Sequence, residues 1–481
     1  MENGKITSKS LSERTNAFFR NLGSSLAGKA KRLAAAALER WNSFLDFFAQ
    51  ADWKVALSLL FMGAGNILYG QIAKGIVFLL VEVLFILFMV FLGGGYLEGL
   101  VTLGTVRTDT WAGIQGDNSI VFMLMGILTI FAIILFVVCY TASLKSALRA
   151  REAVLKGNKP RTFMEDIAAL SGRSFPAVAL VVPLLGVALF SVLPIVMTIL
   201  VAFTNYGGTI QVPAYLVDYV GLENFVTIFS ATNIGETFFR ILGWNILWAF
   251  LSTFVNYFLG LGLALLLSKK CVKGKAFWRA FPILAYAIPG FITLIAFKFM
   301  FSVSGPINYY LTSGHLFDDR TIDFLGMDST WSARFIGLAV NAWLTVPTTM
   351  LLATGILSNV QTDLYEAADI DGASKTRQFF DITLPYVIFA TTPTLISQFI
   401  GNFNNFGTFY FLRGSIISEG YFQASDTDLL INWLYRLSLD GNNNYYSIAA
   451  AVSLLIFIIT SAISLLVYVR SGSYKKEDTY R

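Results

Sequence analysis

The chain has 481 residues, of which 56% are hydrophobic and 14% are charged, and its mean hydropathy is +0.64. Soluble domains usually carry about 25% charged residues, so this composition excludes a water-soluble globular protein and a disordered chain. The two cysteines exclude a disulfide framework, and the single histidine, His315, excludes a metal centre built on several histidines. The remaining class is an all-α integral membrane protein.

A bilayer core about 30 Å thick needs roughly 20 apolar residues for one crossing helix. Runs of this length predict about eight transmembrane helices. They fall at residues 76–95, 120–140, 176–204, 243–267, 276–302, 335–357, 386–406 and 447–469. The shorter apolar stretch 55–72 predicts an interfacial or re-entrant helix, and a ninth span is the alternative.

Lys and Arg are concentrated in every second connection: residues 1–54, 141–175, 268–275 and the tail 471–481. Because cytoplasmic loops carry the excess of Lys and Arg, both termini are predicted to be cytoplasmic. The net charge of +5 therefore reflects membrane orientation and does not indicate nucleic-acid binding. Residues 1–54 also predict a basic amphipathic helix, which either lies on an anionic membrane face or packs on the protein.

Motifs for catalysis, metals and nucleotides are absent from the sequence. It has no P-loop motif for ATP phosphates, no zinc-binding His-Glu-x-x-His motif and no nucleophile-elbow motif. We therefore expect no catalytic residue, no metal site and no bound cofactor. Ionisable residues inside the spans are sparse, and Glu82 is expected to face protein or lie near the headgroups, with packing favoured over function.

The connection 358–385 is too long and too rich in helix signals to be a simple link. Thr362 or Asp363 is predicted to cap a short helix that Gly372 ends. Ser374 is predicted to cap a second short helix before the next span. Such a helix–glycine–helix unit would project from the membrane and offer small side chains and carboxylates to a partner.

This connection resembles the EAA loop of ABC importer permeases, in which the loop docks into a groove of a cytoplasmic ATPase subunit. The match comprises Glu-Ala-Ala, then glycine after three residues, and Ile-x-Leu-Pro after nine more. The resemblance assigns ATPase coupling to Glu366, Ala367, Ala368, Asp371, Gly372, Ile382, Leu384 and Pro385.

From about residue 52 to 470 the chain resembles the larger membrane subunit of maltose/maltodextrin importers, the MalF type, in its Gram-positive form. The stretches that carry this are 242–245, 278–282, 340–343, 398–406 and 423–435. The loop 205–242 is short, so the large periplasmic insertion of the Gram-negative form is missing. The resemblance implies a type I ABC importer permease bundle in the bacterial cell membrane.

Two polar stripes lie inside predicted spans at helical spacing, one with Gln398, Asn402 and Asn405, the other with Asn341, Thr345 and Thr348. Neutral amides and hydroxyls beside aromatic residues suit an uncharged carbohydrate, although hydrogen bonds between packed helices are the alternative. The resemblance identifies Asn341, Leu344, Asn402 and Asn405 as sugar-contacting positions. Other such positions, occupied here by different residue types, are Thr345, Thr348, Gln398 and Gly401.

The resemblance implies an ATP-driven importer for maltodextrin-type oligosaccharides that works by alternating access. Its partners would be a second homologous permease subunit, two ATPase subunits that hold ATP and Mg, and an external sugar-binding protein. The regions expected are the segment 1–54, accessory membrane helices 55–175, the permease core 176–470 and the tail 471–481. A stand-alone secondary carrier or channel and a membrane-embedded enzyme are the competing hypotheses.

Overall fold

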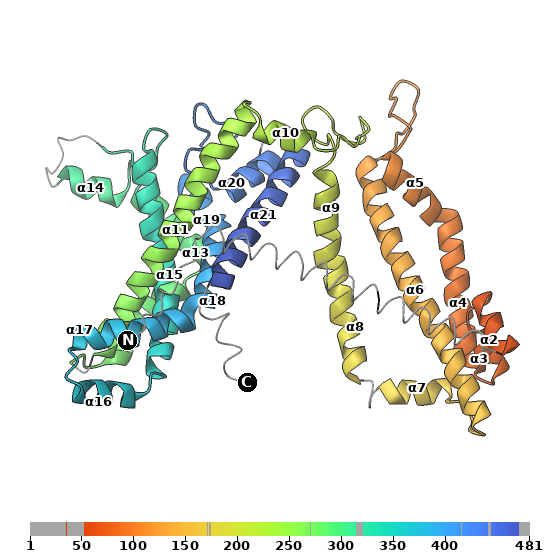
Figure 1. Ribbon diagram of the computed structural model, residues 1–481. Coiled ribbons are helices and arrows are strands. Elements are labelled where there is room, and N and C mark those ends of the chain that lie inside the picture. The colour runs from red at the N-terminus through yellow and green to blue at the C-terminus, as the bar shows by residue number, and fades with distance from the viewer. Residues whose placement is uncertain are drawn as a thin grey trace, which may run out of the picture. The chain divides into compact units, whose positions relative to one another are not determined.

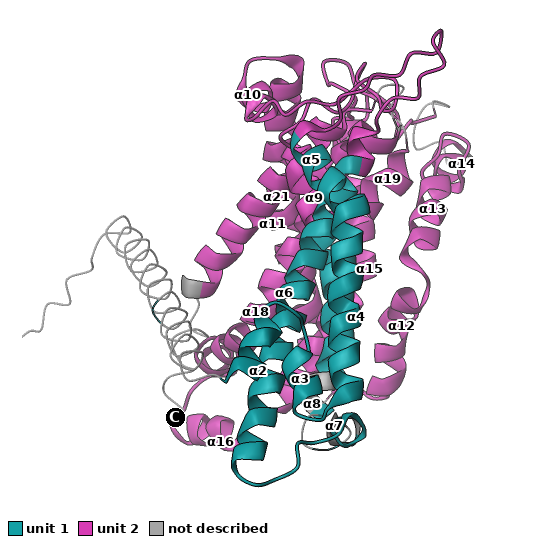
Figure 2. Cartoon of the chain, turned by 90° about the vertical axis from the view of Figure 1, so that its right-hand side faces the viewer, with its two compact units in different colours: residues 1–101, 122–193 teal, residues 102–121, 194–481 magenta. Residues whose placement is uncertain are grey.

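The computed structural model describes residue 35 and residues 52–470, except 171, 173–174, 270, 314–320, 415 and 441–443. The described residues are helical apart from connections that contain isolated β-bridges. They form two compact units, unit 1 with residues 1–101 and 122–193, and unit 2 with residues 102–121 and 194–481 (Figure 2). The predicted N-terminal amphipathic helix and the tail 471–481 lie outside the described residues.

Seven helices among the described residues are long and apolar enough to cross a bilayer, and one bent helix pair makes an eighth candidate. Together they cover all eight predicted runs, which confirms an all-α multi-pass membrane protein. The seven are Ile72–Thr102, Ser119–Leu155, Ala179–Val201, Asn233–Ser268, Thr330–Ser358, Lys375–Arg413 and Tyr446–Tyr468.

Unit 1 is built on a long helical hairpin (Figure 1). Its helices are α2 (Trp53–Ala56), α3 (Ala64–Leu68), α4 (Ile72–Phe88), α5 (Gly94–Thr102), α6 (Ser119–Leu155), α7 (Phe163–Leu170) and α8 (Phe175–Val187). A π-helical turn joins α4 to α5. Phe85 of α4 stacks on Phe136 of α6, with ring centroids 3.9 Å apart, so the two arms of the hairpin are in direct contact.

The stretch 55–72 contains no helix long enough to span a membrane. It folds into the short helices α2 and α3 with a 3₁₀ turn between them, so the alternative of a ninth span is wrong. Glu82 of α4 is buried, and its carboxylate accepts a hydrogen bond of 2.7 Å from the backbone N–H of Met62. Glu82 therefore attaches this stretch to α4, which supports a packing role for this carboxylate.

Helix α6 continues well beyond the apolar run from which it was predicted. The run ends at residue 140, but the helix ends at Leu155, inside the predicted basic connection. Residues 141–155 are mostly Ala, Leu, Lys, Arg and Glu, which have high helix propensity. The end of the apolar run and the end of the helix are therefore different positions here.

Unit 2 is a helix bundle that contains α11 at its centre, packed along α15 and against α18. Its helices are α9 (Leu193–Val201), α10 (Glu223–Phe229), α11 (Asn233–Ser268), α12 (Lys275–Ala287), α13 (Gly290–Met300), α14 (Pro306–Ser313), α15 (Thr330–Ser358), α16 (Thr362–Ile370), α17 (Lys375–Gln378), α18 (Leu384–Phe403), α19 (Gly407–Arg413), α20 (Leu430–Tyr435) and α21 (Tyr446–Arg470). Helices α16 and α17 lie at the end of the unit opposite to α10 and α20 (Figure 1).

The predicted span 276–302 is not one straight helix. It consists of α12 and α13, which meet at 90° around Ile288 and Pro289. Proline disfavours the helical conformation of the residue before it, and Ile288 is extended (φ −84°, ψ 131°). The single-span prediction is therefore corrected to a bent pair.

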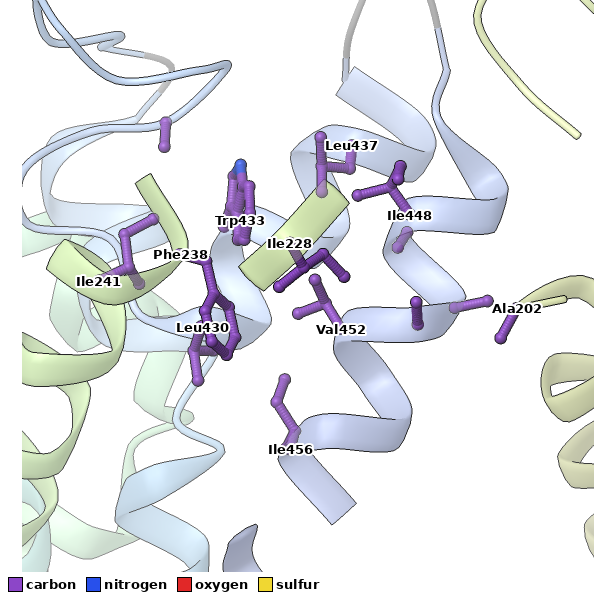
Figure 3. Close-up of a cluster of buried hydrophobic side chains, with 14 of the residues drawn as sticks. Ala202, Ile228, Phe238, Ile241, Leu430, Trp433, Leu437, Ile448, Val452 and Ile456 are labelled. Carbon is purple, nitrogen blue, oxygen red and sulfur yellow. The ribbon is translucent and has the colours of Figure 1, made fainter. Parts of the chain in front are cut away.

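A large buried apolar cluster joins α10, α11, α20 and α21 (Figure 3). Trp433 of α20 is fully buried in it, and its indole Nε1 donates to the carbonyl oxygen of Phe422 at 2.8 Å. Because lipid tails are as apolar as leucine, close packing and hydrogen bonds hold such helices together in a membrane. The labelled members are Ala202, Ile228, Phe238, Ile241, Leu430, Trp433, Leu437, Ile448, Val452 and Ile456.

The loop between α19 and α20 is held by two ion pairs of low exposure. Arg413 pairs with Asp426, and Arg436 pairs with Asp428 at 2.7 Å. Burial raises the pKa of Asp428 to about 6, against the opposing effect of the Arg436 guanidinium. Arg413 also donates to the backbone carbonyls of Leu325, Gly326 and Met327. One arginine thus ties this loop to the chain that precedes α15.

Substitution Arg413→Met should destabilise the purified protein strongly, by about 3–5 kcal/mol, because it leaves Asp426 without its buried partner. Arg377→Met is the matched control, since the Arg377–Asp381 pair is mostly exposed and should contribute less than about 1 kcal/mol. Thermal unfolding of both variants in detergent measures the difference. Equal melting temperatures would contradict a structural role for the buried pair.

Candidate functional site

The connection 358–385 forms the helix–turn–helix hairpin that the sequence predicts. Gly372 follows α16 with φ of +71°, a left-handed conformation in which a Cβ is unfavourable. The N–H of Ala373 donates to the carbonyl of Ala368 at 2.9 Å, and the N–H of Gly372 donates to that of Asp369 at 3.1 Å. This is the Schellman pattern, and it confirms Gly372 as the residue that ends the first helix.

One of the two predicted helix caps is present. The hydroxyl of Ser374 accepts the backbone N–H of Arg377 at 3.3 Å, which confirms the second cap. The first prediction is wrong, because α16 begins with Thr362 as its first helical residue and Gln361 as its N-cap, without a side-chain bond. Helix α17 continues through a π-helical turn into α18, so Pro385 lies inside a continuous helix.

Helix α16 is fastened to the α17–α18 helix by side-chain hydrogen bonds. The carboxylate of Asp369 accepts from Lys375 at 2.7 and 2.9 Å and from Gln378 at 2.6 Å. These bonds hold the pKa of Asp369 below its ordinary value. The hydroxyls of Tyr365 and Thr383 lie 2.8 Å apart. Because Gln378 and Thr383 are buried, the two contacts fix the position of α16 on the longer helix.

The outer side of α16 is exposed. Ile370 is 86% exposed, and Leu364 is the second large apolar side chain on this helix that is exposed. A projecting helix with exposed apolar residues beside carboxylates is suited to contact another protein. Of the coupling residues assigned above, the exposed ones are Glu366, Ala367, Asp371, Gly372 and Pro385, and the half-buried ones are Ala368, Ile382 and Leu384.

Two of the predicted path residues, Asn405 and Gln398, bond to side chains of α15. The amide Nδ2 of Asn405 donates to Oδ1 of Asn341 at 3.2 Å. The amide Nε2 of Gln398 donates to the hydroxyl of Thr349 at 3.1 Å. These two hydrogen bonds join α18 and the residues after it to α15, and the bond between Asn405 and Asn341 is the one that links the two predicted stripes directly.

Asn402 turns instead towards α11. Its Nδ2 donates to the hydroxyl of Thr253 at 3.0 Å, and Asn402 is buried. Helix α18 ends at Phe403, so Asn405 does not share a helix face with Gln398 and Asn402 as predicted. Thr253 was missed by sequence reasoning, although a hydroxyl inside a span was a usable signal.

The remaining predicted sugar positions make local contacts or face open space. The hydroxyl of Thr348 donates to the carbonyl of Thr345 at 2.7 Å, within α15. Leu344 packs against a buried apolar cluster around Leu294. A Cβ added to Gly401 would meet no atom within 4 Å. The stripes thus combine hydrogen bonds between helices, as the packing alternative predicts, with neutral groups that could exchange those bonds for sugar hydroxyls.

Comparison with known proteins identifies the family. Residues 256–471 match the family described as "Binding-protein-dependent transport system inner membrane component". The maltodextrin transport system permease protein MalC of Streptococcus pneumoniae is 33% identical, over 89% of this chain and 98% of MalC. The galactooligosaccharides transport system permease protein GanP of Bacillus subtilis is 32% identical, over 88% of this chain and 99% of GanP.

A solved structure supports the fold. The crystal structure of a bacterial ABC transporter involved in the import of the acidic polysaccharide alginate contains a chain that aligns with a TM-score of 0.50 and 19% identity. The alignment covers 63% of this chain and 97% of that chain. The family match and the identity to MalC over nearly its whole length show the family. The chain belongs to the maltose/maltodextrin type of binding-protein-dependent permeases, the membrane subunits of ABC sugar importers.

Proposed function

We propose that this chain forms part of the membrane path of an importer for neutral maltodextrin-type oligosaccharides, and that separate ATPase subunits drive it through α16. The observation that carries the proposal is the α16 hairpin. It presents exposed apolar and carboxylate side chains, yet it is fixed to the helix that carries Gln398 and Asn402. A loop that only connected two spans would need neither property.

Movement of α16 would reach the path residues through one helix. Gln378 and Thr383, which hold α16, lie on the same continuous helix as Gln398 and Asn402. At a rise of 1.5 Å per residue, Thr383 and Asn402 are about 28 Å apart along this helix. An ATPase that displaced α16 on nucleotide binding would therefore tilt or shift the helix that contributes to the path, which is how alternating access would be driven.

The substrate class follows from the chemistry of the path residues. They offer amides and hydroxyls without charge, and Trp343 and Phe399 lie within two residues of Asn341 and Gln398 along the chain. Sugar hydroxyls need neutral donors and acceptors, and sugar C–H faces pack on aromatic rings. MalC and GanP are named for neutral oligosaccharides, which supports the same class here. Glycine at 401 and threonine at 348, in place of bulkier residues, would widen the path, which would favour oligosaccharides over a strict disaccharide.

The partners follow from the same proposal. Two cytoplasmic ATPase subunits would hold ATP and Mg, a second homologous permease subunit would complete the path, and an external protein would deliver the sugar. This chain would supply no catalytic residue and no cofactor site. Helices α11 and α15 run in the same direction, so the Lys-rich connection 268–275 and the hairpin lie at one end of the bundle. The positive-inside rule supports a cytoplasmic location for that end and for both termini.

The complete importer, purified from the cells that produce it and reconstituted in liposomes, should take up labelled maltodextrins only with ATP inside. This chain reconstituted alone should transport nothing. Uptake by the chain alone, without nucleotide, would instead identify a secondary carrier or channel and overturn the proposal.

Substitution Gly372→Val should uncouple the importer while leaving it assembled. A side chain in the left-handed conformation costs about 1–2 kcal/mol and would distort the turn that positions α16. We expect ATP-driven uptake to fall at least about tenfold. Uptake and co-purification of the ATPase subunits are measured together.

The matched control for this change is Gly157→Val. Gly157 has φ of +73° in the connection after α6, so it carries the same strain outside the hairpin. Uptake in the control should stay near that of the natural protein. Normal uptake in Gly372→Val, or an equal loss in both variants, would argue against a coupling role for the hairpin.

Substitutions Asn402→Ala and Asn405→Ala should change sugar uptake in a manner that depends on chain length. Each removes an amide that pairs across the bundle and that could instead bind a sugar hydroxyl. Uptake of maltose and a series of longer maltodextrins and galactooligosaccharides measures the effect. Unchanged transport of every sugar would remove these residues from the path.

A further inference from the structure

Helix α11 carries a polar stripe that neither the hairpin nor the proposed path explains. Asn245, Ser252 and Asn256 follow one another at intervals of seven and four residues, so they share one face of the helix. All three have an exposed fraction of 0%. The stripe therefore lies inside the bundle, where α11 packs against α15 and α18.

The two ends of this stripe differ in hydrogen bonding. The amide of Asn245 donates to the carbonyl of Phe403 at 3.1 Å and accepts the backbone N–H of Leu430 at 2.8 Å. Neither amide atom of Asn256 has a hydrogen-bond partner among the residues that the structure describes, nor does the hydroxyl of Ser252. Asn245 is thus a structural side chain, and Ser252 and Asn256 need another explanation.

Two contacts give the register of α11 against α15. The guanidinium of Arg334 lies 4.0 Å from the ring centroid of Trp244. Gly260 lies directly against Thr349, because a Cβ added to Gly260 would be 2.6 Å from the Cβ of Thr349. The part of α11 between Trp244 and Gly260 therefore faces the part of α15 between Arg334 and Thr349. Asn341 lies in the middle of that part of α15, near the level of the unpaired groups on α11.

Two side chains from α15 and α18 carry further unpaired atoms, Asn341 at this level and Gln398 about one turn beyond it. Nδ2 of Asn341 and Oε1 of Gln398 are buried without a partner in the described part of the chain. The other polar atom of Gln398, its Nε2, donates to the hydroxyl of Thr349. Thr349 faces Gly260, which lies one helical turn after Asn256 on α11. We name the resulting set the polar junction; it consists of Ser252, Asn256, Asn341 and Gln398.

The chemistry of the polar junction indicates its ligand. A polar group left unpaired at membrane depth costs roughly several kcal/mol, so such groups are normally satisfied. The unpaired atoms include donors on Asn256 and Asn341 and acceptors on Asn256 and Gln398, without any charge. A cation would be repelled by the N–H donors, and an anion by the carbonyl oxygens. Water both donates and accepts, and it is small enough for sites between helices.

We propose that the polar junction is a binding site for water inside the transmembrane bundle. This water satisfies the groups of three helices at once, and it lets α11 exchange hydrogen-bond partners with α15 and α18 as the bundle opens. The site itself is independent of the proposed transport function, whereas its role in opening rests on it. Sugar hydroxyls share the chemistry of water, and the second experiment below separates these two ligands.

The backbone of α15 supports movement at this level. Pro347 lies inside α15, between Asn341 and Thr349. Its ring takes away the intrahelical donor for the carbonyl of Trp343, so α15 is less tightly bonded here than elsewhere. The polar junction thus lies where the neighbouring helix is locally weak.

Hydroxyl-radical labelling by X-ray radiolysis tests the site, because bound water produces radicals that modify adjacent side chains. Trp248 is 1% exposed and lies one turn before Ser252, and its Nε1 has no partner among the described residues. Trp433 is equally buried, but its Nε1 is bonded to Phe422. In the complete importer, Trp248 should be labelled several-fold more than Trp433, and Asn256→Leu should remove the difference. Equal, low labelling of both tryptophans would overturn the proposal.

Leucine at the two asparagines of α11 tests the role in opening. Asn245→Leu should lower the melting temperature of the importer, because two backbone groups lose their partner. Asn256→Leu should leave the melting temperature unchanged or raised, since it removes an amide without protein partners. It should still slow ATP-driven uptake about tenfold, equally for every chain length. Asn256→Ser, which keeps a polar group, should restore most of the rate.

The alternatives have distinct outcomes. A rate loss in Asn256→Leu confined to some chain lengths would identify sugar hydroxyls as the ligand and overturn the water site. A natural rate in this variant would overturn the role in opening. If the natural importer took up no oligosaccharide at all, the proposed function would fail, while the labelling of Trp248 would still decide whether the site binds water.

Discussion

The bilayer offers no water to polar groups that a helix bundle leaves unpaired, so every amide and hydroxyl between the helices must find a partner. In unit 2 this constraint falls on the interface of α11, α15 and α18. Asn245 meets it with two backbone groups, and Asn402 meets it with Thr253. The same bonds therefore hold α11 to α18 and to the start of α20, and they leave other polar groups of this interface without a partner among the described residues.

The two ends of unit 2 are held by different interactions. The loop between α19 and α20 is fixed by Arg413 and Arg436, whose ion pairs lie in or near the protein interior. The α16 hairpin has exposed ion pairs, which contribute little in water. Its geometry depends instead on the left-handed turn at Gly372 and on the buried side chains of Gln378 and Thr383. One end is therefore rigid, and the other is a defined but accessible surface.

Sequence predicted the positions of the spans because apolar length alone determines them. It predicted the hairpin because Gly372 and Ser374 act locally, on their own helix ends. The sequence prediction failed where backbone conformation decides the helix path. Residues 276–302 form one apolar run, but the structure bends this run by 90° at Pro289.

The polar contacts across the bundle were predicted only in part. The sequence singled out Asn341 and Asn405 as polar residues of the bundle interior, and the structure joins them, although Asn405 lies beyond the end of α18. The partners of Asn402 and Gln398 were not predicted: a hydroxyl inside a span marks Thr253 and Thr349 as polar, but they are far away in sequence and no periodicity pairs them with a particular amide. Which hydroxyl an amide reaches depends on helix register, which packing sets.

Neutral side chains suit a path that must both close and open. In this structure three bonds join the proposed path residues to one another or to α11 and α15. Bonds of this kind between membrane helices are worth about 0.6 kcal/mol each, so breaking all three costs about 2 kcal/mol. A buried ion pair in the same place would cost roughly 3–5 kcal/mol when one partner is left alone. Amides and hydroxyls thus keep the helices aligned at a low cost of separation, which is what the proposed path requires if sugar or water is to replace these bonds.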